Sequence, residues 1–385
     1  MSAAGILLGI IVMLSVLGGT NFYVAHRLFQ WISFIFPHIN AKIYIGIYIL
    51  IVSSMFLGFM RFLLPIPLAV RHITGWISAH WMGVFMYLLM LFLAADLMIL
   101  LGSFVKIIPS PIPGIVRFYS GSLVVLLTTG IVSYGLYNAN QVKYVSYDIQ
   151  LSESSLSSKL NIVMVSDLHL GAINSETNLD KVIQGINKLD PDIVCMVGDI
   201  FNDDFASIQD PGKVIERFKS INARYGVYAC LGNHDGGSSL GQMIELLEKS
   251  NITLLNDEYR IIDDRFVLIG RLDRSPIGGF GDMQRTDITD ILASLNTNLP
   301  IIVMDHNPSH IEEYGDTVDI ILSGHTHKGQ VFPGPLFTRS MFIVDYGHYQ
   351  KDAASPHVIV SSGAGTWGMP MRVGTNSEIV SIVLW

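Results

Sequence analysis

The 385-residue sequence has only two cysteines, very few charges in its first third and no excess of basic residues. Two cysteines, Cys195 and Cys230, are too few for a disulfide framework or a cysteine-based zinc site. Each lies in an apolar run, so we expect buried, reduced thiols with a packing role. The net charge of −8 argues against nucleic-acid binding, because proteins that bind nucleic acids usually carry a basic patch or a basic pI.

The few charges are unevenly distributed along the chain. Residues 1–140 hold six basic side chains and one acid, Asp96, whereas the remaining 245 residues hold 18 basic and 31 acidic side chains. The net charge is therefore +5 in the first part and −13 in the second. An ordinary soluble domain has about a quarter of its residues charged. We therefore predict one region in the membrane and one in water.

Residues 1–142 are predicted to form a transmembrane region of about four helices, although three or five helices also fit. A span needs about 20 mostly apolar residues. The segment Leu28–Ala41 is apolar but short and contains Pro37, so we expect a re-entrant or interfacial piece there. The four windows that qualify are Ala3–Val24, Ile43–Met60, Trp76–Val105 and Phe118–Val142.

The basic residues of the loops favour one orientation by a small margin. With four spans, loops 25–42 and 106–117 share one side and carry four basic residues, against Arg61, Arg71 and Lys143 on the other. The positive-inside rule then favours an extracytoplasmic C-terminal domain in a multi-pass protein of the cell membrane. No basic residue precedes the first apolar run, so we expect the first helix to be retained rather than cleaved.

Asp96 and His80 lie inside the third apolar window. An intramembrane carboxylate is a functional-site hypothesis by default. The alternative, which we favour, is that Asp96 pairs with a lysine or arginine or sits near a helix end. The region lacks the paired broken helices that would suggest a transport path.

The remainder of the chain is predicted to be an α/β domain over residues 160–385, joined to the membrane region by a linker or edge strand at 143–159. Short apolar runs alternate with amphipathic stretches, which is typical of α/β folds. The expected strands are Leu160–Ser166, Ile193–Val197, Val227–Leu231, Ile301–Met304, Ile320–Leu322 and Val358–Val360. The expected helices are Leu179–Leu189, Lys213–Ile221, Met243–Leu247 and Ile288–Leu295.

Five of these strands are each followed by side chains that can bind metals. In open α/β sheets, sites form beyond the carboxyl ends of the strands, so these groups are expected on one rim. Carboxylate, amide and imidazole ligands without thiolate suit Mn, Fe or Zn. Seven candidates are too many for one tetrahedral ion and suit two ions about 3.5–4 Å apart. The motifs are DLH at 167–169, GD at 198–199, GNHD at 232–235, DH at 305–306 and GHTH at 324–327.

This series of motifs closely resembles that of the calcineurin-like metallophosphoesterases, over about residues 150–385. The longer segments PDIVCMVGDI, GVYACLGNHD, DHNPSH, SGHTHKGQ and SSGAGTWGMPMR are similar to the membrane-associated bacterial branch of that family. The resemblance implies two packed mixed β-sheets flanked by helices, and two metal ions. The ligands it implies are Asp167, His169 and His327 for one ion, Asn233, His306 and His325 for the other, and Asp199 between them.

The resemblance also implies two roles beside the metals. His234 would protonate the leaving oxygen or stabilise the charged transition state, and Asp235 would orient His234. Lys328 departs from the pattern, since relatives usually have glycine there. Two alternatives stand for Lys328: it contacts a substrate phosphate, or it points into solvent.

The function that these residues imply is that of a membrane-anchored phosphohydrolase in which a hydroxide held between two metals attacks phosphorus in line. The anchor favours a substrate at the membrane surface, either a membrane-proximal or a lipid-linked phosphate ester. One alternative is hydrolysis of a UDP-2,3-diacylglucosamine-type pyrophosphate. Another is a non-enzymatic membrane sensor or scaffold, against which the complete ligand set argues. The sequence leaves the oligomeric state open.

Overall fold

The computed structural model describes residues 3–59, 67–151, 156, 158–171, 173, 176–295 and 298–385. The chain forms two compact units, Met1–Tyr134 and Gly135–Trp385, called here the helical unit and the head. Arg61, which entered the orientation argument, lies outside the described residues, as do residues 152–155 and 157 of the expected linker.

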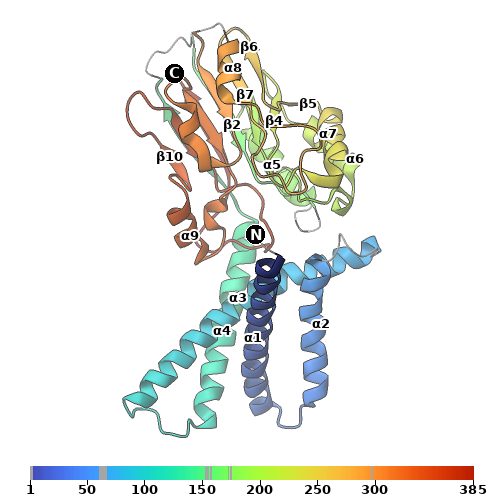
Figure 1. Ribbon diagram of the computed structural model, residues 1–385, viewed down its shortest axis with the longest axis vertical. Coiled ribbons are helices and arrows are strands. Elements are labelled where there is room, and N and C mark those ends of the chain that lie inside the picture. The colour runs from blue at the N-terminus through green and yellow to red at the C-terminus, as the bar shows by residue number, and fades with distance from the viewer. Residues whose placement is uncertain are drawn as a thin grey trace. The chain divides into compact units, whose positions relative to one another are not determined.

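Four apolar helices make up the N-terminal part of the chain (Figure 1). They are α1 (Ala3–Ile35), α2 (Ala41–Phe59), α3 (Leu68–Phe104) and α4 (Gly114–Ala139). Within the described residues, α1, α3 and α4 are long and apolar enough to cross a membrane, and α2 is a shorter apolar helix. The prediction of a separate re-entrant or interfacial piece at Leu28–Ala41 is wrong. Helix α1 continues through Leu28 to Ile35 and ends just before Pro37.

The one acid of the helical unit is held by an ion pair. Asp96 Oδ1 lies 2.9 Å from Arg27 Nη2, and Asp96 Oδ2 accepts a hydrogen bond of 2.6 Å from the Tyr23 hydroxyl. The Arg27 guanidinium also lies over the Phe92 ring. The expectation that Asp96 pairs with a basic residue is confirmed. His80 lies 2.8 Å from the Trp76 carbonyl of its own helix.

The head contains two six-stranded mixed sheets, which confirms the predicted α/β class (Figure 1). The first has the order β1 (Val142–Ile149), β12 (Ser377–Leu384), β2 (Leu160–Val165), β3 (Ile193–Val197), β4 (Val227–Cys230) and β5 (Ile252–Leu254). The second has the order β10 (Gly347–Tyr349), β11 (His357–Val360), β9 (Ile320–Ser323), β8 (Ile301–Met304), β7 (Phe266–Gly270) and β6 (Glu258–Ile262). The helices are α5 (Glu176–Lys188), α6 (Pro211–Lys219), α7 (Leu240–Lys249), α8 (Ile288–Ser294) and α9 (Gly334–Met341).

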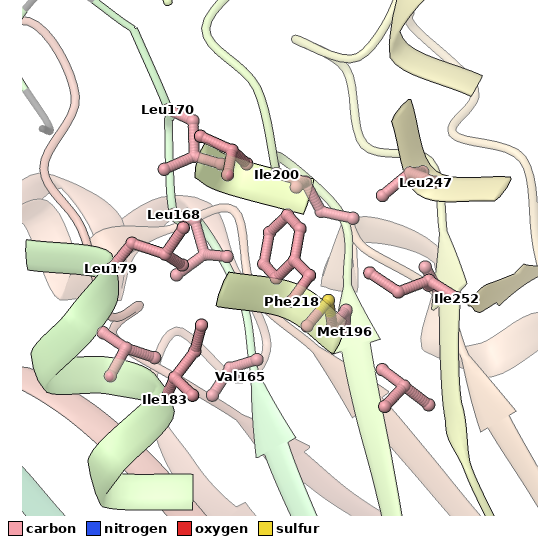
Figure 2. Close-up of a cluster of buried hydrophobic side chains, with 14 of the residues drawn as sticks. Val165, Leu168, Leu170, Leu179, Ile183, Met196, Ile200, Phe218, Leu247 and Ile252 are labelled. Carbon is pink, nitrogen blue, oxygen red and sulfur yellow. The ribbon is translucent and has the colours of Figure 1, made fainter. Parts of the chain in front are cut away.

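The alternation of side chains along β2 shows how the sheets are buried on both faces. Ile162 and Met164 belong to the core that includes strands of both sheets, whereas Val163 and Val165 belong to the core that includes α5, α6 and α7. Figure 2 shows the second of these cores, with side chains from the helices lying against the first sheet. A strand buried on both faces needs a continuous apolar run, and Ile162–Val165 of β2 provide one.

Both cysteines lie in the core that joins the sheets, as expected. Burial raises the pKa of the Cys195 thiol to about 12, and it also raises the pKa of Cys230. Both thiols are therefore protonated and unreactive at neutral pH.

Candidate metal centre

The predicted ligands follow five strands, and parallel pairing brings the ends of these strands together. β2, β3 and β4 are parallel neighbours in the first sheet, as are β8 and β9 in the second. The structure gathers the predicted ligands into two groups, within each of which the ligand atoms lie within 4.8 Å of one another. The first group is Asp167, His169 and His327, and the second group is Asp199, His306 and His325.

Asn233 joins the second group, and Asp199 faces both. The Oδ1 atom of Asn233 lies 2.7 Å from His325 Nδ1. Asp199 Oδ2 lies 3.1 Å from His306 Nε2 in its own group and 3.7 Å from His169 Nε2 in the other. One carboxylate therefore has ligand atoms of both groups within about 4 Å, the arrangement that a bridging ligand needs.

The ligands depend on an unusual backbone. Five of the seven have a positive φ between 47° and 69°, a region that costs non-glycine residues about 1–2 kcal/mol each and clusters at functional sites. Neighbouring glycines allow the close approach: a Cβ on Gly232 would lie 2.3 Å from Asp199 Oδ1, and one on Gly198 would lie 2.6 Å from the His306 ring. The five residues are Asp167, His169, Asp199, His325 and His327.

Burial keeps most of the imidazoles neutral, as metal binding requires. Burial lowers the pKa of His169 to about 3 and that of His325 to about 4. His306 differs: burial acts to lower its pKa, but the adjacent Asp199 carboxylate outweighs burial and raises it. For Asp199 burial acts to raise the pKa, and the charge of His306 lowers it.

These groups fit divalent cations. The Nε2 atoms of His169 and His327 lie 3.1 Å apart, and His327 Nε2 lies 3.3 Å from Asp167 Oδ1. Two buried carboxylates among largely neutral imidazoles call for positive charge. His306 Nδ1 lies 2.9 Å from the Val197 carbonyl, which can only accept, so Nδ1 carries the proton and Nε2 is available as a ligand.

His234 has a partner that the sequence analysis did not assign. Its Nδ1 lies 2.7 Å from Asp203 Oδ1, and its ring centroid lies 5.1 Å from that of His169. Burial acts to lower the pKa of His234, but the hydrogen bond to Asp203 and nearby carboxylates raise it. The only sequence signal for this pairing was the place of Asp203 in the loop after Asp199.

Asp235, expected to orient His234, contacts backbone instead. Its carboxylate accepts hydrogen bonds of 2.8 Å from the backbone amides of Gly232 and Phe201. The bond from Phe201 ties the loop after β4 to the loop after β3. Asp235 thus stabilises the loops on which the ligands are carried.

Arg372, in the quoted C-terminal motif, also supports the centre without having been singled out. It is fully buried and donates hydrogen bonds to the carbonyls of Ser362 (2.6 Å) and Gly365 (2.7 Å). The Gly365 amide in turn donates to the Asp167 carbonyl at 2.9 Å. The motif therefore holds the backbone of the first metal-ligand loop.

Lys328 is partly buried and lies against an aromatic ring. Its ammonium lies 3.7 Å from the centroid of the Tyr346 ring, a cation–π contact, and burial lowers its pKa. The Tyr346 hydroxyl donates to the buried Glu378 carboxylate at 3.0 Å.

Comparison with known proteins agrees with this geometry. Residues 160–329 match the family model of the calcineurin-like phosphoesterases. An uncharacterized metallophosphoesterase of Campylobacter jejuni is 30% identical over 266 residues, which cover 68% of each chain. A transmembrane protein with metallophosphoesterase domain from Danio rerio is 30% identical over 283 residues, which cover 68% of this chain and 62% of the relative.

Among solved structures, the NAD nucleotidase of Haemophilus influenzae is 18% identical over 54% of this chain and 46% of that chain. Its TM-score of 0.37 is too low to carry an argument. The two sequence relatives and the family match suffice on their own. The chain belongs to the calcineurin-like phosphoesterase family, and its class is that of the metal-dependent phosphoesterases.

Proposed function

We propose that the protein is a membrane-anchored phosphohydrolase with two metal ions, acting on a phosphate ester at the membrane surface. The observation that carries the proposal is the position of Asp199, whose carboxylate lies within 4 Å of ligand atoms from both groups. The family match supports phosphoester chemistry, and the three candidate spans support the anchor.

The first group and the second group would each hold one ion, with Asp199 between them and Asn233 completing the second. Bound there, divalent ions would supply a nucleophile from water and offset the charge of a phosphoryl group. They would also overcome the repulsion between an acidic head and an anionic substrate.

A residue of the chain itself can supply the proton that the leaving oxygen needs. His234 lies beside the first group, and its hydrogen bond to Asp203 favours the protonated ring. A protonated His234 can donate to the leaving oxygen while Asp203 holds the ring in place. General-acid help of this kind is worth roughly 10²–10⁴ in rate.

The orientation in the membrane is part of the proposal, with the head on the extracytoplasmic side. The loop charges support it, and labelling tests it. Glu258 lies exposed on β6, and Glu258→Cys in intact cells should react with an impermeant maleimide. Reaction only after the cells are permeabilised would place the head in the cytoplasm.

The test of the chemistry measures bound metal and hydrolysis on the same samples. The full chain, loaded with Mn²⁺, should bind two ions and hydrolyse bis(p-nitrophenyl) phosphate. Asp199→Ala and Asn233→Ala should bind fewer ions and lose the activity. Asp319→Ala is the matched control, because Asp319 is a part-buried head carboxylate that accepts its hydrogen bond from the Ile301 amide.

Three outcomes separate the alternatives. Full activity in both ligand variants would overturn the mechanism. Two bound ions without turnover of any phosphate ester would favour the sensor or scaffold. Equal losses in Asp319→Ala would show that the assay reports folding rather than the metal centre.

A further inference from the structure

The head exposes large apolar side chains on and around α9, the helix that Figure 1 labels near the lower end of the head's ribbon. Phe337 is 62% exposed and Met341 74% exposed, although soluble domains usually cover such residues. The same helix carries the exposed cation Arg339. The apolar patch, as we call it, consists of Phe332, Leu336, Phe337, Met341, Ile343 and Trp367.

The patch adjoins the point where the chain leaves its last candidate span. That span ends at Ala139, and its final turn, Gly135–Ala139, belongs to the head. Within the head, Asn138 Nδ2 donates hydrogen bonds to the carbonyls of Arg372 (3.1 Å) and Thr375 (2.8 Å). The Phe332 amide donates to the carbonyl of Val373, in the same loop, at 2.9 Å.

The patch also adjoins the candidate metal centre. The Trp367 ring centroid lies 5.6 Å from that of His234, and the ring of Phe342, which follows α9, lies 6.1 Å from that of His325. Gly334, the first residue of α9, comes seven residues after His327. One short segment therefore joins a metal ligand to the exposed apolar surface.

We propose that the apolar patch inserts into the headgroup boundary of the bilayer that the N-terminal helices cross. Aromatic and long aliphatic side chains beside a cation are what interfacial lipid binding requires. The hydrogen bonds of Asn138 connect the loop 372–375, which also contacts Phe332 of the patch, to the end of a candidate span. This connection is why we take the lipid leaflet as the occupant of the patch. Resting on the proposed function, this surface identifies the substrate class as a phosphate ester in the headgroup of a bilayer lipid.

The first test measures the depth of the patch without using activity. A nitroxide is attached to Phe337→Cys in the full chain in lipid nanodiscs, and its accessibility to oxygen and to a water-soluble nickel complex is compared. The matched control is Ile261→Cys, an exposed apolar residue of β6, 47% exposed; the native thiols are buried.

The expected result is that the label at 337 is reached by oxygen and shielded from nickel, whereas the label at 261 is reached by nickel. Equal nickel access at both positions would overturn the proposal. Dipolar broadening between labels at 337 would also overturn it, because it would show that a second copy covers the patch.

The second test compares two substrates. The variant Phe337→Ser/Met341→Ser should lower the ratio of hydrolysis of a phospholipid in vesicles to hydrolysis of soluble bis(p-nitrophenyl) phosphate, by roughly tenfold or more, because two interfacial apolar contacts are lost. Ile261→Ser should leave the ratio unchanged. An unchanged ratio in the double variant would contradict the role of the patch. If the unmodified chain hydrolyses neither substrate, the proposed function fails, while the nitroxide test still decides the insertion.

Discussion

Both units of the protein hold carboxylates in close contact with other ionisable groups, but these groups are arranged differently. In the helical unit, Asp96 and Arg27 meet at 2.9 Å, and Tyr23 donates to the second carboxylate oxygen. In the head, the carboxylates of Asp167 and Asp199 are surrounded by imidazoles, most of which burial keeps neutral. The first arrangement is a single ion pair, whereas the second gathers several groups that could together hold metal ions.

The difference shows that a carboxylate in an unexpected place does not by itself mark a functional site. Both Asp96 and Asp199 met the criterion of an unexpected carboxylate. What separates them is their surroundings, since Asp96 faces a guanidinium and Asp199 faces imidazoles of two candidate metal-binding groups. A closed pair is a structural element with little capacity to bind anything else, and a cluster of acids and neutral imidazoles is a binding site.

The largest expected effect comes from opening the closed pair. Arg27→Met leaves Asp96 without its cation in an apolar unit, at a cost of about 3 kcal/mol. Hydrogen exchange of α1 and α3 peptides, measured in nanodiscs, should rise in this variant. Arg27→Met/Asp96→Leu, which removes both charges, should recover most of the protection. Equal exchange in the single and double variants would mean that the pair is not coupled.

The next largest effect is expected when Mn²⁺ binds to the two candidate metal groups of the head. Mn²⁺ at ten times its dissociation constant should stabilise the head by about 1.4 kcal/mol for each of the two ions, because only the folded head assembles the ligands. The increase in the unfolding temperature of the head by calorimetry measures it. Arg27→Met should keep this increase and Asp199→Ala should lose most of it. The comparison fails if Mn²⁺ stabilises Asp199→Ala as much as the unmodified chain.

Much of this contrast could be predicted from sequence, because the relevant patterns are local. Each ligand follows a short apolar run, so its place at the end of a strand follows from the residues on either side. The partner of Asp96 was predicted as a type, a lysine or arginine. Its identity as Arg27 could not be, because the two residues are 69 positions apart and meet only when α1 packs against α3.

The same limit explains what was missed in the head. β12 lies between β1 and β2 although it ends the chain, and the sequence has no signal for pairing over such a distance. The contact between His234 and Asp203 forms in a loop with positive φ at Asp199 and Asp203, a conformation that the sequence does not reveal. Arg372 donates hydrogen bonds to backbone carbonyls, and the positions of backbone carbonyls in a loop cannot be predicted from the residue types.

A smaller effect should follow from the pairing of His234. Asp203→Asn removes the charge that favours the protonated ring, and it should lower hydrolysis of bis(p-nitrophenyl) phosphate about 10–100-fold, with bound metal unchanged. Asp204→Asn is the matched control in the same loop, since Asp204 Oδ1 accepts from the Ala206 amide and Asn keeps an acceptor there. Loss of metal in Asp203→Asn would instead make Asp203 part of the metal centre.

The smallest effect concerns Asp319, a part-buried head carboxylate outside the metal centre. Burial raises its pKa, although the hydrogen bond from the Ile301 amide opposes the shift. A carboxyl whose pKa is higher in the folded than in the unfolded chain binds more protons when folded. The free energy of unfolding therefore falls as the pH rises from the pKa of the unfolded chain, about 3.9, through the higher pKa of the folded chain.

Asp319→Asn keeps an acceptor for the amide and should remove this slope, a change below about 0.5 kcal/mol once solvent screening is considered. Hydrogen exchange of peptides covering β8 and β9 between pH 4 and 7, corrected for intrinsic rates, measures it. An identical slope in the variant would show that Asp319 is not the origin of the pH dependence. A removed slope would show that a part-buried carboxylate outside the ion pair and the candidate metal groups also contributes to the pH dependence of stability.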